Sequence, residues 1–327
     1  MRKISLRSTN QDRLTQLRDQ GEDSEVLLAR LALIESEGLR KDLAKMAKGS
    51  RCYPEVLPTQ ASLRWSTKGP NLGGFDRDFW RLHKRVIYPD PGEWWLEFDW
   101  QGIEARMFIA YSGDQEDLDW LQPGVDIHTN TCIKYLFEWE GLPDDWKGSK
   151  DERRTRSKNL RYAVIQYGRD AKAILGMSGI ESLGLDRQLL LQRSERFLRA
   201  RPKAQAFKQK VWQGCVQNGY ARTFLGHRRW LFGDAETKQK EGMAHMISGS
   251  VAGMMDWCLI QICHPLLGAF PAASCILNKH DGAILAFPDS LAQEQVIPVV
   301  KELVEREWEI GEGVPPMSFP AEWEVWT

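Results

Sequence analysis

The spacing of hydrophobic and polar residues predicts a chain that is mostly helical and carries a few short strands. Residues 1–49 have a polar, helical pattern with one apolar stripe at Leu27, Leu28, Leu31, Leu33 and Ile34. Helical spacing returns in residues 103–111 and over most of residues 126–218, and a long helix rich in small apolar residues is predicted from 238 to 262. Residues 51–75 contain three prolines and three glycines and are predicted to be extended or looped.

The strands are predicted from short apolar runs beside turns. The run Trp94–Asp99 follows a Pro/Gly turn and is typical of a buried strand. Cys275–Leu277 and Ala283–Phe287 flank the polar sequence Lys279-His280-Asp281-Gly282, a pattern that predicts a β-hairpin. A further strand and turn are predicted over residues 219–226. The predicted class is therefore α+β, with a small antiparallel sheet and helices on one face.

Composition narrows the class of protein. The chain has 327 residues, of which 42% are hydrophobic and 27% charged, values that are ordinary for a globular enzyme. No run approaches 18 apolar residues and no apolar segment follows Met-Arg-Lys at the start, so neither a membrane span nor a secretory signal is expected. The six cysteines form no Cys-x-x-Cys pair and the six histidines lack metal-ligand spacing. We expect buried, reduced thiols and a cytoplasmic location.

The formal charge of −1 conceals an uneven distribution. Residues 147–240 hold 22 Lys and Arg against 8 Asp and Glu, while the rest of the chain holds 22 and 37. A basic segment within an acidic chain indicates contact with a polyanion, although a solvated basic helix surface gives the same pattern.

Two aspartates are candidate metal ligands. Asp99 ends the first predicted strand, and Asp281 lies in the turn of the predicted hairpin. If these strands are neighbours in one sheet, both carboxylates emerge at the same edge. Such hard oxygens suit Mg²⁺, and two ions about 3.5–4 Å apart activate a hydroxyl and stabilise a leaving group. A lone aspartate at a strand end is more often a turn former, so the hypothesis depends on the surrounding residues.

Six sequence elements resemble the motifs of family A DNA polymerases, the bacterial DNA polymerase I family. Asp-Trp-Gln-Gly-Ile-Glu-Ala-Arg, which begins at Asp99, resembles motif A; Arg154-x₃-Lys158-x₃-Tyr162 resembles motif B; and His280-Asp281 resembles motif C. The other three elements are residues 126–129, residues 219–229 and residues 64–72. Because order, spacing and identity agree, the chain is identified as a member of this family. The resemblance implies a DNA-templated DNA polymerase that transfers a nucleotide from a dNTP to a primer 3′-OH with two Mg²⁺ ions, for which Mn²⁺ can substitute.

The nucleotide-binding residues follow from helix geometry and from the resemblance. Arg154, Lys158 and Tyr162 recur at every fourth position and so share one helix face. The two cations suit a triphosphate and the ring suits stacking on a base or sugar. A solvated basic helix would show the same spacing. The resemblance implies the nucleotide-binding role and adds His128 as a phosphate contact, although a capping or core histidine is the alternative for that residue.

Sugar selection and the template-side contact are also implied by the resemblance. Glu104 is implied to block a ribose 2′-OH, which favours dNTPs over rNTPs. One residue is inserted before Tyr167-Gly168, so either Tyr167 or Gln166 takes the family's template-side tyrosine position. A π-bulge in the helix would absorb this insertion.

Contacts with the primer–template are implied at five residues. Arg64 and Asn71 are expected on the minor-groove and template side, where they would read acceptors common to all correct base pairs. The remaining expected DNA contacts are His280, Arg222 and Arg229.

The chain departs from the family pattern at several positions. Gly282 replaces the glutamate that usually follows the motif C aspartate, and Ala244 and Ser248 stand where the family usually has Asn and Gln. Trp100 replaces tyrosine, but the metal contact implied there is a backbone carbonyl, which any residue supplies.

The resemblance implies a right-hand polymerase that lacks most of the thumb. The expected parts are a helical thumb base (1–50), a first part of the palm (51–125), fingers (126–235) and a second part of the palm (236–327). No Asp-x-Glu exonuclease signature precedes motif A, so no proofreading exonuclease is expected in this chain. The small size of the chain and its departures from the family motifs favour a phage-type enzyme acting in a host cytoplasm.

Other interpretations remain open at this point. A relative of the single-subunit RNA polymerases is disfavoured by Glu104, and a non-catalytic binding subunit is disfavoured by retention of both aspartates with Arg154 and Lys158. The chain would either work with a second polypeptide that carries a thumb and an exonuclease, or act alone as a minimal enzyme. The apolar stripe at 27–34 would contact such a partner or pack on the palm of the same chain. No membrane partner is expected.

Overall fold

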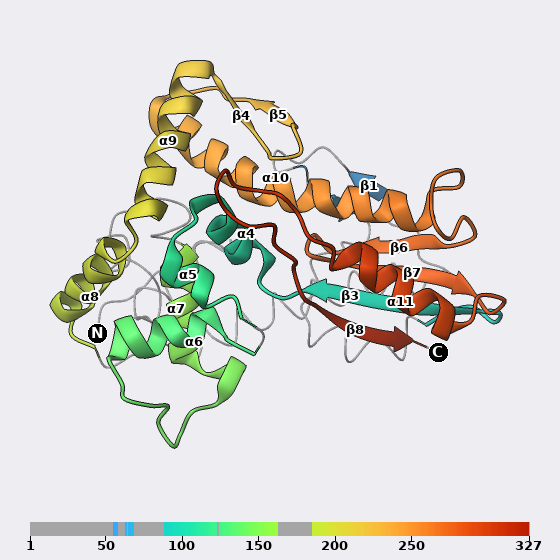
Figure 1. Cartoon of the computed structure of the whole chain (residues 1–327), viewed down its shortest axis with the longest axis horizontal. Coiled ribbons are helices and arrows are strands. Elements are labelled where there is room, and N and C mark those ends of the chain that lie inside the picture. The colour runs from blue at the N-terminus through green and yellow to red at the C-terminus, as the bar shows by residue number, and fades with distance from the viewer. Residues whose placement is uncertain are drawn as a thin grey trace, which may run out of the picture.

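The computed structural model of the chain describes residues 55–57, 63, 65–68, 88–122, 124–162 and 185–326. Within them, a four-stranded antiparallel sheet carries two helices, and a group of shorter helices lies beyond one end of the sheet (Figure 1). The α+β class is confirmed. The predicted helical segment 1–49, with its apolar stripe, lies outside the described residues.

The sheet has the strand order β6-β7-β3-β8, with every neighbouring pair antiparallel. Its strands are β3 (Glu93–Trp100), β6 (Ser274–Asn278), β7 (Gly282–Pro288) and β8 (Ala321–Trp326). The predicted strand 94–99 and the predicted hairpin around residues 279–282 are therefore confirmed. Two small hairpins complete the strands, β1 (Glu55–Leu57) with β2 (Ser66–Lys68) and β4 (Tyr220–Arg222) with β5 (Arg228–Trp230).

Alternation along β3 separates a core face from a polar face. Leu96 and Phe98 are fully buried and lie opposite apolar residues of β7 in the ladder. Burying each side chain contributes about 1.5–3 kcal/mol to folding. Glu97 and Asp99 point to the other face because successive side chains of a strand alternate. Asp99 therefore places a carboxylate near the end of the strand, outside the main core.

The long helix α10 (Ala235–Cys263) runs along the sheet, and α11 (Gln293–Val304) lies in front of the strands, below α10, in Figure 1. Their apolar residues, including Met254, Met255 and Val300, join the core beside β3. By length and composition, α10 is the one helix among the described residues that could cross a membrane, but 67% of its most apolar window is buried inside the protein. In this structure α10 is a helix of the protein core.

Small residues let neighbouring elements approach α10 closely. A side chain on Gly253 would come within 2.9 Å of Leu225, and one on Gly242 would overlap Cys215 of α9. The two glycines thus allow α9 and the β4–β5 turn to lie against the helix.

The shorter helices belong to the segment of the chain between β3 and α10. They are α4 (Ile103–Ser112), α5 (Gln115–Asp119), α6 (Ile127–Thr131), α7 (Glu152–Leu160), α8 (Arg187–Arg199) and α9 (Pro202–Asn218), together with a π-helix (Cys132–Phe137) and a 3₁₀ turn (Gly148–Lys150). The described part of 126–218, which leaves out 163–184, agrees with the mostly helical pattern predicted there. The subdomain boundaries given above stay predictions.

The described cysteines are all unpaired thiols. Burial raises the pKa of Cys132 and of Cys258 to about 12, so both stay protonated at neutral pH.

Candidate active site

The sheet brings Asp99 and Asp281 to neighbouring positions at one end. Asp99 pairs with Gly282 in the β3–β7 ladder, and the N–H of Trp100 donates to the carbonyl oxygen of Asp281 at 2.7 Å. Asp99 is half-buried and Asp281 is exposed. The expectation that these strands are neighbours is confirmed.

The turn that carries Asp281 is held by a dense set of local bonds. The N–H of Asp281 donates to the carbonyl oxygen of Lys279 at 3.1 Å, which makes His280, with φ +78°, the centre of a γ-turn. The N–H of His280 donates to Asn278 Oδ1 at 3.0 Å, and the Lys279 ammonium pairs with Glu97 of β3 at 2.6 Å. A left-handed φ at a non-glycine residue costs free energy. The surrounding bonds offset that cost and tie Asp281 to β3.

Gly282 lies opposite Asp99, close to the backbone of β3. A Cβ atom at this position would come closer than 3.0 Å to the carbonyl oxygen of Phe98 and within 3.1 Å of Oδ1 of Asp99. The departure from the family's glutamate therefore has a physical reason in this chain, because the β3–β7 spacing leaves no room for a side chain.

Glu104 lies in the first turn of α4, directly after the strand that carries Asp99. The chain reverses into α4 at Gly102, whose φ of 58° is left-handed and suits glycine. One carboxylate oxygen of Glu104 accepts a hydrogen bond from Ser248 Oγ of α10 at 2.7 Å. The glutamate is thus held between two helices near the end of the sheet.

The basic face predicted on one helix is present on α7. Arg154 Nε donates to Asp126 Oδ2 at 2.6 Å, and the Lys158 ammonium lies 5.8 Å from the ring centre of Tyr162. Lys158 is exposed, whereas Arg154 and Tyr162 are half-buried. Tyr162 packs against a cluster that includes Ala105, the neighbour of Glu104 in α4. This contact places the end of α7 beside the helix that carries the glutamate.

His128 is buried below this face, at 4% exposure. Its ring lies 5.8 Å from that of Tyr162, and its Nδ1 has no hydrogen-bond partner. Burial and then the positive charges of Arg161, Arg154 and Lys158 lower the pKa of His128 to about 3, although Asp126 opposes this shift. The imidazole is therefore neutral at pH 7 and lies among cations.

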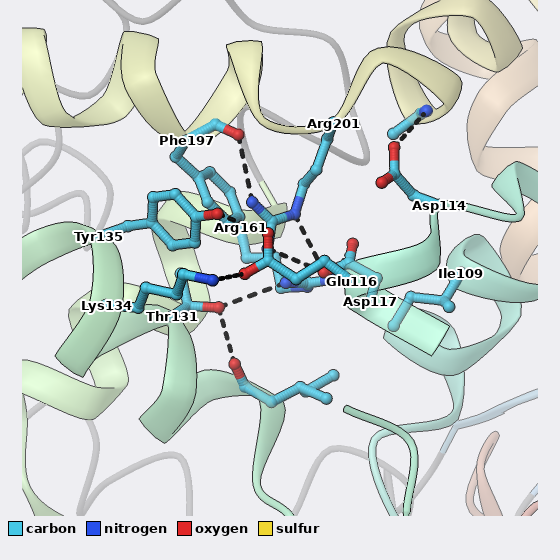
Figure 2. A network of polar contacts seen from close by, with 12 residues as sticks. Ile109, Asp114, Glu116, Asp117, Thr131, Lys134, Tyr135, Arg161, Phe197 and Arg201 are labelled. Atoms are coloured by element: carbon cyan, nitrogen blue, oxygen red, sulfur yellow. Dashed lines mark hydrogen bonds and ion pairs between the residues drawn. The ribbon is translucent and has the colours of Figure 1, made fainter. Parts of the chain in front are cut away.

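A buried ion cluster holds Arg161, the residue that directly follows α7 (Figure 2). Asp117 of α5 pairs with Arg161 at 2.5 Å and with Arg201 at 2.9 Å, and all three side chains are almost completely buried. The Arg201 guanidinium also lies 3.9 Å from the ring centre of Phe197. Burial alone raises the pKa of Asp117, but the two arginines outweigh this effect, and the pKa of the carboxyl lies below its ordinary value.

The same short segment anchors α9. Asp114 accepts from the N–H groups of Lys203 and Ala204 at 3.2 Å each, which caps the first turn of that helix. Residues 114–117 therefore fix both α7 and α9 relative to α4.

The β4–β5 hairpin carries two of the expected DNA contacts. Arg222 is exposed, while Arg229 pairs with Glu241 of α10 at 2.8 Å. Arg228, between them in the hairpin, lies over the ring of Tyr220 at 5.2 Å. A phosphate would have to compete with Glu241 for Arg229.

Three expected site residues, Arg64, Asn71 and Tyr167, lie outside the described residues. Arg161 and Tyr162 form a π-helical turn at the end of α7, just before the position of the predicted insertion. The choice between Gln166 and Tyr167 stays open.

Sequence reasoning missed the structural roles of four residues that shape the site. These are Asp117 and Arg201 in the ion cluster, Asp126 as the partner of Arg154, and Ser248 as the partner of Glu104. In the sequence, the first three are ordinary charged residues of polar helices, and only their burial or pairing distinguishes them.

The donor set at the sheet end fits Mg²⁺. Among the described residues, no three His, Cys, Asp or Glu side chains converge on one point. Two aspartates alone suit a cation that keeps waters and takes further ligands from substrate phosphates, as Mg²⁺ does.

Comparison with known proteins decides the family. The model of DNA polymerase family A matches residues 2–319. The chain belongs to DNA polymerase family A. It is similar to the thermostable DNA polymerase I of Thermus aquaticus, with 27% identity over 275 residues, and to DNA polymerase I of Streptococcus pneumoniae, with 26% identity over 278 residues. These matches cover 81% and 80% of this chain but 30% of each relative, so the chain spans less than a third of their length.

A solved structure shares the fold. The POL domain of Pol1 from M. smegmatis, in complex with DNA primer-template and dNTP, superposes with a TM-score of 0.73 at 18% identity. The match covers 97% of this chain and 56% of that one. This chain thus shares the fold of that domain.

Proposed function

We propose that the chain is the palm and fingers of a DNA-templated DNA polymerase, which joins a dNTP to a primer 3′-OH. The observation that carries the proposal is the pairing of β3 with β7, which brings Asp99 beside Gly282 and Asp281 beside Trp100. Family membership and the likeness to a polymerase domain bound to primer-template and dNTP support it.

Asp99, Asp281 and the backbone carbonyl of Trp100 would hold two Mg²⁺ ions, or Mn²⁺ in their place. When bound, such a pair of ions activates the primer hydroxyl and stabilises the pyrophosphate as it leaves. The strained turn at His280 and the bonds that hold it keep the second carboxylate in place for this role.

The triphosphate would lie along α7. Arg154 and Lys158 supply positive charge, and Tyr162 offers a ring on which the base or sugar can stack. The orphaned Nδ1 of buried His128 provides a further donor once the imidazole carries its proton there. A phosphate nearby would also raise the pKa of this histidine, because a negative charge favours its protonated form.

Glu104 would face the C2′ side of the sugar and exclude a ribose. DNA would pass the basic middle of the chain, with Arg222, Arg229 and His280 among its contacts. Arg64 and Asn71 are proposed as the minor-groove and template contacts, and Tyr167 as a template-side residue.

A second polypeptide that carries a thumb and a proofreading exonuclease is proposed as a partner. A phage origin and a cytoplasmic location remain expectations from the sequence.

The test is primer extension with Mg²⁺ by Asp99→Asn and Asp281→Asn variants. Each is expected to lose extension to below a few per cent of wild type, while DNA binding is kept or slightly tighter because a charge that repels phosphate is lost. Asp289→Asn is the matched control, since Asp289 is an exposed aspartate at the opposite end of β7. Substantial extension by either site variant would remove that aspartate from catalysis, and an inactive wild type would favour a binding subunit.

A further inference from the structure

We propose that Ser248 of α10 is a positioning residue for Glu104 and thereby sets the selection between deoxyribo- and ribonucleotides; this inference rests on the proposed polymerase function. Ser248 stands at a position where the family usually has glutamine, so its role does not follow from the family pattern.

The hydroxyl of Ser248 forms its hydrogen bond outside its own helix, as that of buried Ser157 does with the carbonyl oxygen of His128. Buried helical hydroxyls commonly donate to a carbonyl one turn earlier in their own helix. Those of Ser112, Thr131, Ser194 and Ser250 do so here. Ser248 instead donates across the helix pair to Oε1 of Glu104 at 2.7 Å.

The environment makes this hydrogen bond strong. Ser248 is 4% exposed, and α10 packs directly against α4 at this level. A hydrogen bond to a carboxylate is stronger than one between neutral groups, and exclusion of water strengthens it further. One oxygen of Glu104 is therefore fixed in direction.

Fixing that oxygen has a consequence for selectivity. A glutamate has three side-chain torsions, and a carboxylate that rotates away leaves room for a 2′-OH beside the sugar. A carboxylate held by Ser248 keeps the same space filled, so discrimination depends on the serine as well as on the glutamate. In this proposal the serine acts through Glu104 and not on the nucleotide itself.

The experiment measures single-nucleotide incorporation of a dNTP and the matching rNTP by the wild-type chain and by Ser248→Ala, Ser248→Thr and Ser250→Ala. Loss of a charged hydrogen bond is expected to lower the dNTP/rNTP ratio by about tenfold in Ser248→Ala. Ser248→Thr keeps the hydroxyl and should restore the ratio. Ser250→Ala removes a buried hydroxyl two residues away that contacts Tyr111, and should keep the wild-type ratio.

A double variant separates the proposed contact from a general effect on folding. If Ser248 acts through Glu104, Ser248→Ala should change the ratio no further in a Glu104→Ala background. A wild-type ratio in Ser248→Ala, or the same fold-change in both backgrounds, would overturn the inference while the proposed function stands.

Absence of any incorporation by the wild-type chain would defeat the proposed function separately. The contact is then judged by thermal unfolding of the same single and double variants. Non-additive shifts in Tm support it, and additive shifts overturn it.

Discussion

A methyl group at Gly282 tests whether the β3–β7 spacing positions the two aspartates. In Gly282→Ala the new Cβ would lie closer than 3.0 Å to the carbonyl oxygen of Phe98 and 3.1 Å from Cα of Asp99, where ordinary contacts begin at 3.4 Å. Both neighbours belong to a backbone that is hydrogen-bonded on two sides, so they cannot rotate away. The end of β7 must move by several tenths of an ångström, and Asp281 moves with it.

The size of the effect follows from this overlap. Forcing an extra carbon into a packed site costs about 1–3 kcal/mol, and we expect a loss of about 2 kcal/mol in the free energy of unfolding. The methyl would also lie 3.1 Å from Oδ1 of Asp99. Because misplacement of a catalytic group by about 1 Å can cost about a hundredfold in rate, primer extension should fall about 10- to 100-fold. The Mg²⁺ concentration for half-maximal extension should rise as well.

Urea denaturation and primer extension over a Mg²⁺ series measure the two effects. Gly141→Ala is the matched control, since a Cβ there meets nothing within 4 Å and the backbone is not left-handed. That variant should be neutral or gain about 0.4–1 kcal/mol from reduced freedom of the unfolded chain. A Gly282→Ala protein with the unfolding midpoint, extension rate and Mg²⁺ dependence of wild type would refute the reasoning.

Three further predictions concern sugar selection, stability and assembly. Glu104→Ala should raise ribonucleotide incorporation and lower the overall rate, and Tyr162→Phe should lose acceptance of dideoxynucleotides. Single-turnover assays with each nucleotide measure both effects. Unchanged dNTP/rNTP discrimination in Glu104→Ala would contradict the proposed role of the glutamate in sugar selection. Asp117→Asn should cost about 3–5 kcal/mol at pH 7, because Arg161 loses its carboxylate partner and Arg201 is left with Glu116, at 3.9 Å. The pKa of Asp117 is lowered in the folded protein, so its stabilising effect is present above about pH 4 and is lost as the pH falls through the folded pKa. The Asp117→Asn variant should therefore lose less stability than the wild type when urea denaturation is repeated at pH values from about 5 down to 2. The same acid-induced loss in both proteins would contradict the pairing. The isolated chain should extend primers by only a few nucleotides per encounter. A partner that carries a thumb should co-purify with the wild-type chain but not with the double variant Leu28→Asp/Leu31→Asp. Synthesis over hundreds of nucleotides by the chain alone would exclude the need for such a partner.

Local patterns of residues were sufficient for several elements. The apolar run at 94–99, the polar turn between two apolar runs at 279–282 and the small apolar residues of 238–262 all formed the elements they predict. Each depends on side-chain alternation, turn chemistry or helical spacing within a few residues. The pairing of β3 with β7 was only the condition of the two-aspartate hypothesis, and the structure meets that condition.

Two elements beside the core were not predicted. The strand β8 carries alternating glutamates and apolar residues, a local strand signal that was overlooked, and it pairs with β3, more than 220 residues earlier in the chain. The helix α11 contains Pro298, yet Val296, Val300 and Val304 form a buried stripe against the core. In α11, tertiary packing outweighed the contrary local signal of the proline.

The sequence by itself determined which residues supply the carboxylates, the basic helix face and the candidate sugar gate. Only the tertiary structure decided that Gly282 lies against Phe98, that Asp117 joins two arginines from distant helices, and that Ser248 holds Glu104. The physical reason is that these three features depend on distance and burial. A polar residue in a helical pattern looks the same in sequence whether it faces water or a buried partner, and a glycine looks the same whether a side chain would meet open space or a neighbouring strand.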